Sequence, residues 1–207
     1  FCLFALAIAR PKSLCAAFRS HHPYLQIARS LIIVVEVGIF ILAFRYLPLA
    51  DAHAIAGIAP LLVTALAVPF LGEKVGLRRW TAIAIGFVGL LVIVRPGIGA
   101  FNPAALIPLA GAGLWAVYQI LVRKVSDDDT ATSLLYMAVI GAVVMTLLAP
   151  FFWTPPDTTG WLLLGALGVV GSLGHYILIL AFRATTATTL QPFHYIVLLW
   201  ATAIGYL

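Results

Sequence analysis

Glu36 is the acidic residue that lies well inside a long apolar segment of this sequence. A charged side chain at the centre of a bilayer costs about 2.5–3.5 kcal/mol on insertion scales, so such a group normally faces the interior of a helix bundle. Glu36 could therefore exchange a proton or bind a cationic group. The alternative interpretation is a neutral, hydrogen-bonded glutamic acid that only contributes to packing.

Two further groups of polar and aromatic residues could form a binding site. Trp115, Tyr118 and Gln119 are spaced three and four residues apart, which places them on one side of a helix. They could wall a cavity for an aromatic or amphipathic molecule, or anchor the chain at the membrane interface. The second group is Gln191, His194 and Tyr195, which could line a pathway or reach from the interface towards water.

Other charged residues are more simply explained as structural. The run 127–129 holds three aspartates and could bind a divalent cation, but we interpret it as a solvated turn and helix cap. Glu73 is interpreted as part of a loop clamp with Arg78 and Arg79.

The sequence contains no recognisable catalytic set. It lacks a glycine-rich phosphate loop, a zinc-spaced histidine pair and a nucleophile elbow. Cys2 and Cys15 have neither metal-ligand spacing nor a disulfide pattern. We therefore expect no catalytic residue, no metal and no cofactor. The net charge of +5 does not indicate nucleic acid, because the basic residues lie between apolar runs without a basic face.

Composition identifies the kind of element that must position these residues. The 207 residues are 63% hydrophobic and 9% charged, whereas soluble domains carry roughly 25% charged residues. The mean hydropathy is +1.11. We therefore predict an all-α polytopic membrane protein, with seven complete spans at about 27–45, 52–71, 80–96, 103–123, 132–153, 161–182 and 188–207.

Basic residues support this number of spans. If the loop 10–29 is cytoplasmic, ten lysines and arginines fall on the cytoplasmic side and two, Arg45 and Arg95, on the outer side. This bias follows the positive-inside rule, and one missed helix would scramble it.

An internal repeat relates the two halves of the chain. Residues 39–45 recur at 177–183 with six of seven identities, at an offset of 138. The two copies lie five hydrophobic segments apart in chain order, and an odd step reverses the direction of crossing, as in many secondary transporters. The offset pairs Glu36 with Gly174, next to His175. Glu36 and His175 also lie at similar predicted depths, so His175 is a candidate partner of Glu36; the alternative is a histidine bonded to a backbone carbonyl.

Several ordered motifs resemble those of the EamA family of the drug/metabolite transporter superfamily. They comprise Leu71-Gly-Glu73, Arg78-Arg-Trp80, the segment 86–97, Ala181-Phe-Arg183 and Gln191-Pro-Phe193. The resemblance implies ten helices in two inverted five-helix repeats. It would assign residues 1–97 to the first repeat and 98–207 to the second, with both repeats truncated and the seven spans corresponding to helices three to nine.

We therefore predict a secondary transporter of a small metabolite such as an amino acid, an amine or a drug-like solute, working by alternating access. Its partners would be that solute, the lipid bilayer and a proton or another coupling ion, in a bacterial-type inner membrane. Two alternatives remain: a membrane-embedded lipid-modifying enzyme that uses Glu36 and His175 as an acid–base pair, and a non-transporting scaffold with a closed core.

Overall fold

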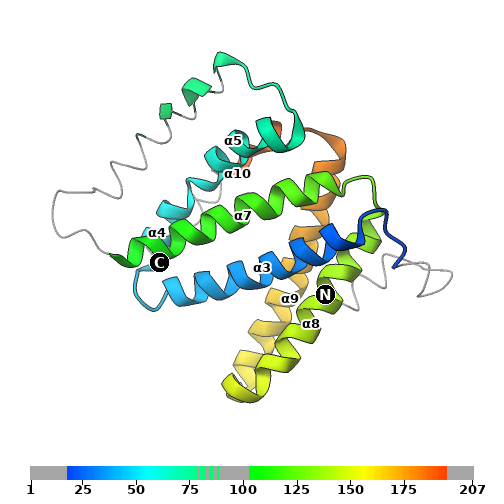
Figure 1. The fold of residues 1–207 in the computed structure, drawn as a ribbon. Helices are drawn as coiled ribbons and strands as arrows, with labels where there is room; N and C mark the ends of the chain where they lie inside the picture. Colours follow the sequence, from blue (N-terminus) through cyan, green and yellow to red (C-terminus); the bar gives the residue numbers. More distant parts are fainter. Residues whose placement is uncertain (1–17, 79, 83, 86–87, 89–102, 195–207) are drawn as a thin grey trace. The chain divides into compact units, whose positions relative to one another are not determined.

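The computed structural model describes residues 18–78, 80–82, 84–85, 88 and 103–194. Within these residues every regular element is a helix (Figure 1), which confirms the all-α prediction. The elements in chain order are α3 (Pro23–Ala43), α4 (Leu49–Ala56), α5 (Ala59–Leu71), the short 3₁₀ helix η1 (Pro103–Ala105), α7 (Leu106–Lys124), α8 (Thr130–Phe152), α9 (Thr158–Ala184) and α10 (Ala187–His194).

Five segments of the described chain are long and apolar enough to cross a membrane. They are Pro23–Ala43, Asp51–Leu71, Pro103–Lys124, Thr130–Phe151 and Thr158–Ala184. Each matches one of the predicted spans to within about four residues, which is the usual accuracy of boundaries drawn from a sequence. Most of the predicted spans 80–96 and 188–207 lies outside the described residues.

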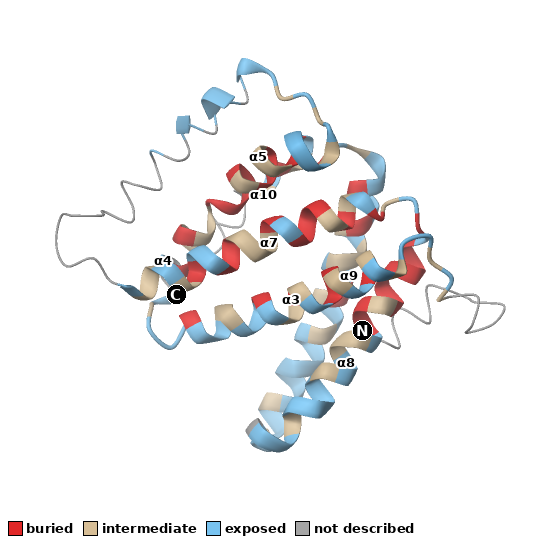
Figure 2. Ribbon diagram, viewed as in Figure 1, coloured by how far each residue is buried: buried red, intermediate tan, exposed pale blue. Residues whose placement is uncertain are grey.

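Long apolar side chains lie exposed along these helices, as a lipid-facing surface requires. On α8 and α9, Phe151 is 78% exposed and Leu162 is 72% exposed. Figure 2 shows large exposed stretches on both helices, and buried residues gather near the start of α8. A water-facing helix would hide these side chains, so the exposure supports an integral membrane protein.

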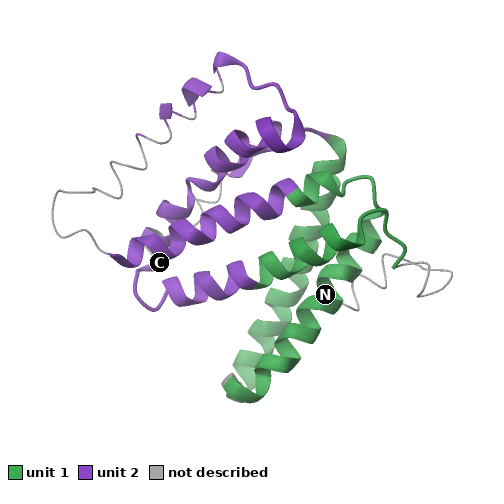
Figure 3. Cartoon of the chain, viewed as in Figure 1, with its two compact units in different colours: residues 1–34, 121–184 green, residues 35–120, 185–207 purple. Residues whose placement is uncertain are grey.

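The chain divides into two compact units (Figure 3). Unit 1 contains residues 1–34 and 121–184, and unit 2 contains residues 35–120 and 185–207. Each unit combines residues from both halves of the sequence. The division into repeats at 1–97 and 98–207 concerns evolutionary duplication, and it stays a prediction.

In unit 1, α8 and α9 pack side by side. Asp129 stands at the N-cap position of α8. The Asp157 carboxylate precedes α9 and accepts a 2.8 Å hydrogen bond from the backbone N–H of Gly160. The Asp157 side chain thus satisfies an N–H group that has no partner inside α9, whereas the Asp129 side chain makes no cap hydrogen bond.

In unit 2, α10 packs against α5. Between α4 and α5, Gly57 and Ile58 keep helical backbone angles, but the regular hydrogen-bond ladder is interrupted there. Two features of the sequence mark the limits of α5. Pro60 lies in its first turn, where a missing N–H is tolerated. Gly72 ends it with a left-handed φ of 66° and donates its N–H to the carbonyl of Val68.

Candidate functional site

Unit 2 contains a cavity of about 460 Å³, which falls in the size range of small-molecule sites. Its wall is built from the C-terminal part of α3, from α4 and the start of α5, from α7, and from the end of α10. The lining residues are Glu36, Phe40, Phe44, Leu49, His53, Ala56, Gly57, Ala59, Pro60, Ala112, Trp115 and His194. Three of the predicted site residues, Glu36, Trp115 and His194, therefore share one cavity.

Glu36 is the acidic residue of the cavity wall. It is 8% exposed, and it makes no hydrogen bond or ion pair with any residue that the structure describes. Its position follows from helical periodicity, because buried Gln26, Arg29 and Ile33 precede it on the same stripe of α3 at three- and four-residue spacing. Among the described residues, no lysine or arginine lines the cavity.

The interrupted hydrogen-bond ladder between α4 and α5 also lies at the cavity. Pro60 has no N–H to donate to the carbonyl of Ala56, four residues earlier. Leu61 donates instead to the carbonyl of Ile58 at 2.9 Å, so Gly57 also lacks the i+4 bond of a continuous helix. The carbonyls of Ala56 and Gly57 are thus without their usual helical donors where both residues line the cavity.

Aromatic rings form much of the remaining wall. The His53 ring stacks on Phe40, with centroids 6.1 Å apart, and lies 5.8 Å from the Phe44 centroid. Gly111 of α7 permits this arrangement, because a Cβ atom there would lie 2.7 Å from Cε2 of Phe40. This close approach between two helices is one that the sequence alone did not indicate.

Trp115 lines the cavity, whereas its predicted companions Tyr118 and Gln119 lie behind the wall. Tyr118 is fully buried and stacks on Trp115 with 5.3 Å between ring centroids. The His194 ring contacts Trp115 edge-on at 6.5 Å. Trp115 is therefore held between Tyr118 and His194.

Gln119 joins α7 to α10 through a buried amide network. Its Oε1 atom accepts a 3.2 Å hydrogen bond from Nε2 of Gln191, which also donates to the carbonyl of Ala187 at 2.8 Å. The Gln119 Nε2 atom lies 3.4 Å from Nε2 of His194. Gln191 does not line the cavity, but it and Gln119 fix the helix that carries His194.

Glu73 fixes the other end of α10. Its two carboxylate oxygens accept hydrogen bonds from the backbone N–H groups of Ala187 at 2.8 Å and Thr188 at 3.1 Å. A carboxylate at a helix N-terminus satisfies free donors and complements the helix dipole. Glu73 therefore acts as a cap on α10, which is more specific than the loop clamp that the sequence suggested.

The other predicted site residues are placed differently. His175 lies on α9 in unit 1, where its Nδ1 atom is 3.0 Å from the carbonyl oxygen of Gly171. Glu36 belongs to unit 2, so the pairing of Glu36 with His175 stays a prediction. Tyr195 lies outside the described residues.

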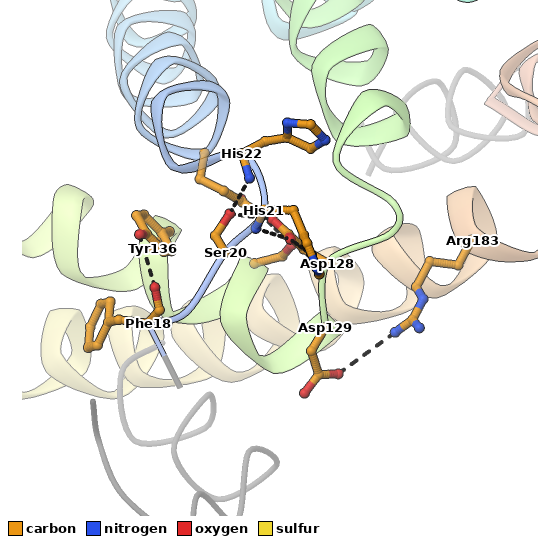
Figure 4. Close-up of polar contacts among 10 residues, drawn as sticks. Phe18, Ser20, His21, His22, Asp128, Asp129, Tyr136 and Arg183 are labelled. Carbon is orange, nitrogen blue, oxygen red and sulfur yellow. Dashed lines mark hydrogen bonds and ion pairs between the residues drawn. The ribbon is translucent and has the colours of Figure 1, made fainter. Parts of the chain in front are cut away.

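Unit 1 contains a polar cluster that the sequence analysis missed. Asp128 is 3% exposed, whereas a solvated turn was predicted for this run of aspartates. Figure 4 shows Ser20 and His21 gathered around its carboxylate. Ser20 donates its hydroxyl, the backbone N–H of His21 donates at 2.8 Å, and Nε2 of Gln26 donates at 2.8 Å.

These donors determine the charge of Asp128. Burial by itself raises the pKa of this carboxyl, but the hydrogen bonds from Ser20, Gln26 and His21 outweigh burial and lower the pKa to about 2. Asp129 lies beside Arg183, with 3.8 Å between charged atoms. Within the described residues no group of three metal-binding side chains occurs.

Comparison with known proteins finds one family model and several relatives that this chain resembles. A family model described as the EamA-like transporter family matches residues 1–95. A riboflavin transporter of Vibrio cholerae is 32% identical over 171 residues, which cover 81% of this chain and 57% of the relative. An S-adenosylmethionine uptake transporter of Rickettsia felis is 30% identical, covering 91% of this chain and 64% of the relative.

A third relative is a pseudopaline exporter of Pseudomonas aeruginosa, 29% identical over 80% of this chain and 59% of the relative. The chain thus spans about three fifths of the length of these relatives. All three relatives are named as transporters and none as an enzyme. This chain therefore resembles the EamA-like transporter family over residues 1–95, and it resembles these bacterial transporters over most of its length.

Proposed function

We propose that this protein is a secondary transporter of a small metabolite and that the cavity of unit 2 is its substrate site. The observation that carries the proposal is the cavity itself, which combines a buried carboxyl group, aromatic walls and an interrupted hydrogen-bond ladder on apolar helices. Relatives named as riboflavin, S-adenosylmethionine and pseudopaline transporters support a small molecule as the cargo. Among these names are both an uptake transporter and an exporter, so they do not select a direction.

The proposed mechanism is alternating access between two inverted repeats, at residues 1–97 and 98–207. The 138-residue offset of the internal repeat supports the duplication. Backbone carbonyls without helical donors recur at the central sites of such transporters, and the interrupted hydrogen-bond ladder between α4 and α5 places two of them in residues that line the cavity. Glu36 would bind the substrate or a coupling proton, and His175 would adjust the charge of Glu36.

The membrane that we propose is a bacterial-type inner membrane, because the three relatives come from bacteria.

The cavity also argues against the two alternative functions, a scaffold and a lipid-modifying enzyme. A scaffold would be expected to have a closed core, and a lipid-modifying enzyme would need its acid and base at a cleft facing the headgroups. Neither expectation accounts for a carboxyl group in an aromatic-walled cavity of about 460 Å³.

A metabolite comparison tests the proposal. The protein, with all of the sequence that its gene encodes, is expressed in bacteria as wild type, Glu36→Gln and Asp51→Asn. Asp51 is the control, since it is exposed on α4 and does not line the cavity. Mass spectrometry then compares metabolites in cells and medium.

We expect one or more solutes to shift with wild type and Asp51→Asn and not with Glu36→Gln, at equal membrane levels. Wild-type flux of that solute in Glu36→Gln would remove Glu36 from the mechanism. If no variant, wild type included, moved any solute, the transporter assignment would fail.

A further inference from the structure

The chemical environment of Glu36 limits what the cavity can hold. A carboxylate that is taken out of water requires a compensating charge or hydrogen-bond donors. Glu36 is 8% exposed, and no described residue supplies either. Among the described residues no such group is present, and a ligand or a proton can supply it.

The rest of the wall favours a positive ligand. The faces of aromatic rings attract cations, and Trp is the strongest of these rings. Phe40, Phe44 and Trp115 all line the cavity. The carbonyl oxygens of Ala56 and Gly57, which lack their helical donors, add partial negative charge at the same wall.

The same features disfavour other ligand classes. An anion would meet the Glu36 carboxylate, with no lysine or arginine among the described lining residues to offset the repulsion. A strongly hydrated inorganic cation would need several oxygen ligands, whereas most of this wall is apolar. A weakly hydrated cation attached to an apolar or aromatic body satisfies both the carboxylate and the rings.

We propose that the cavity of unit 2 binds an organic cation, with Glu36 as its counter-ion and Trp115, Phe40 and Phe44 as the aromatic walls around its charged group. The inference deepens the proposed transport function by naming the substrate class of the same site. It requires only binding, so it can be tested without measuring flux.

The probe is the (3-hydroxyphenyl)trimethylammonium ion, and its neutral isostere is 3-tert-butylphenol. The two molecules have almost the same shape and differ in charge. Binding of each is measured by equilibrium dialysis against the purified, detergent-solubilised protein expressed with all of its encoded sequence. Empty micelles correct for partitioning into detergent.

We expect saturable binding of the ammonium ion at least about tenfold tighter than that of the phenol, a ratio equivalent to about 1.4 kcal/mol. Glu36→Gln should abolish this preference, whereas Asp51→Asn should keep it. Trp115→Leu should weaken binding of the ammonium ion more than binding of the phenol, because it removes the π face and keeps an apolar wall.

Measurements on the wild type alone can overturn the proposal. They do so if the two probes bind with equal affinity, or if the ammonium ion shows no saturable binding. Retention of the preference in Glu36→Gln would exclude Glu36 as the counter-ion. If the wild type does not prefer the ammonium ion but still shifts a metabolite, the organic-cation proposal is rejected and the proposed transport function is not. Binding without any flux would instead reject the transport function.

Discussion

Replacing Asp128 by Asn should destabilise the protein in a pH-dependent way. The Asp128 carboxylate accepts hydrogen bonds from Ser20, from the backbone of His21 and from Gln26, and so ties the segment before α3 to the loop before α8. Asn keeps the size of the side chain and loses the charge. Its NH₂ group would also face donors where the carboxylate accepts.

The magnitude follows from the pKa of Asp128, which lies at about 2 compared with an ordinary 3.8. A depressed carboxyl pKa means that the folded state favours the ionised form. The resulting stability is fully present above the ordinary pKa and is lost as the pH falls towards 2. The difference corresponds to about 2 kcal/mol at pH 7 and about 1 kcal/mol at pH 3.

The assay is thermal unfolding of detergent-solubilised protein, followed by tryptophan fluorescence between about pH 7 and about pH 2.5. We expect Asp128→Asn to lower the Tm by roughly 5 °C at neutral pH. The difference from wild type should shrink in the acid range. Asp127→Asn is the matched control, because Asp127 is exposed and carries the same charge one residue away.

Two results would refute this reasoning. The first is a Tm difference between wild type and Asp128→Asn that stays constant down to pH 3. The second is an equal effect of Asp127→Asn and Asp128→Asn, which would mean that net charge and not the hydrogen-bonded cluster determines stability.

Three further predictions concern unit 2. Gly111→Ala should lower the free energy of unfolding by about 1–3 kcal/mol and weaken ligand binding, because its Cβ atom would displace the Phe40 ring. The control in the unfolding and dialysis experiments is Gly113→Ala, whose Cβ atom would meet no atom within 4 Å. Glu73→Gln should cost about 1 kcal/mol by weakening the cap of α10, and an unchanged Tm would contradict that role. Gln119→Leu should cost about 1–3 kcal/mol by leaving Gln191 without its amide partner, and adding Gln191→Leu should recover part of the loss in a double-mutant cycle.

Some of the candidate site could be predicted from the sequence because it depends on local properties. Glu36 stands out from an apolar segment by composition alone, and helical spacing places it on the same stripe as Gln26 and Arg29. Trp115 lies in the cavity wall, and its role in binding a substrate stays a prediction. Tyr118 and Gln119 were also predicted to line this wall, but they lie buried behind it. Helical spacing predicts which side of the helix a residue lies on, and it does not predict how far that residue is from the cavity.

The sequence by itself determined the membrane class, the all-α fold and the positions of the five described spans, because apolar length and composition are properties of each segment alone. The family resemblance also came from the sequence, through the order of its motifs. The tertiary structure decided which side chains meet. The burial of Asp128, the capping of α10 by Glu73 and the approach of Phe40 to Gly111 join residues between 71 and 115 positions apart in the chain. No periodicity in the sequence reports such contacts, since they depend on how the helices pack.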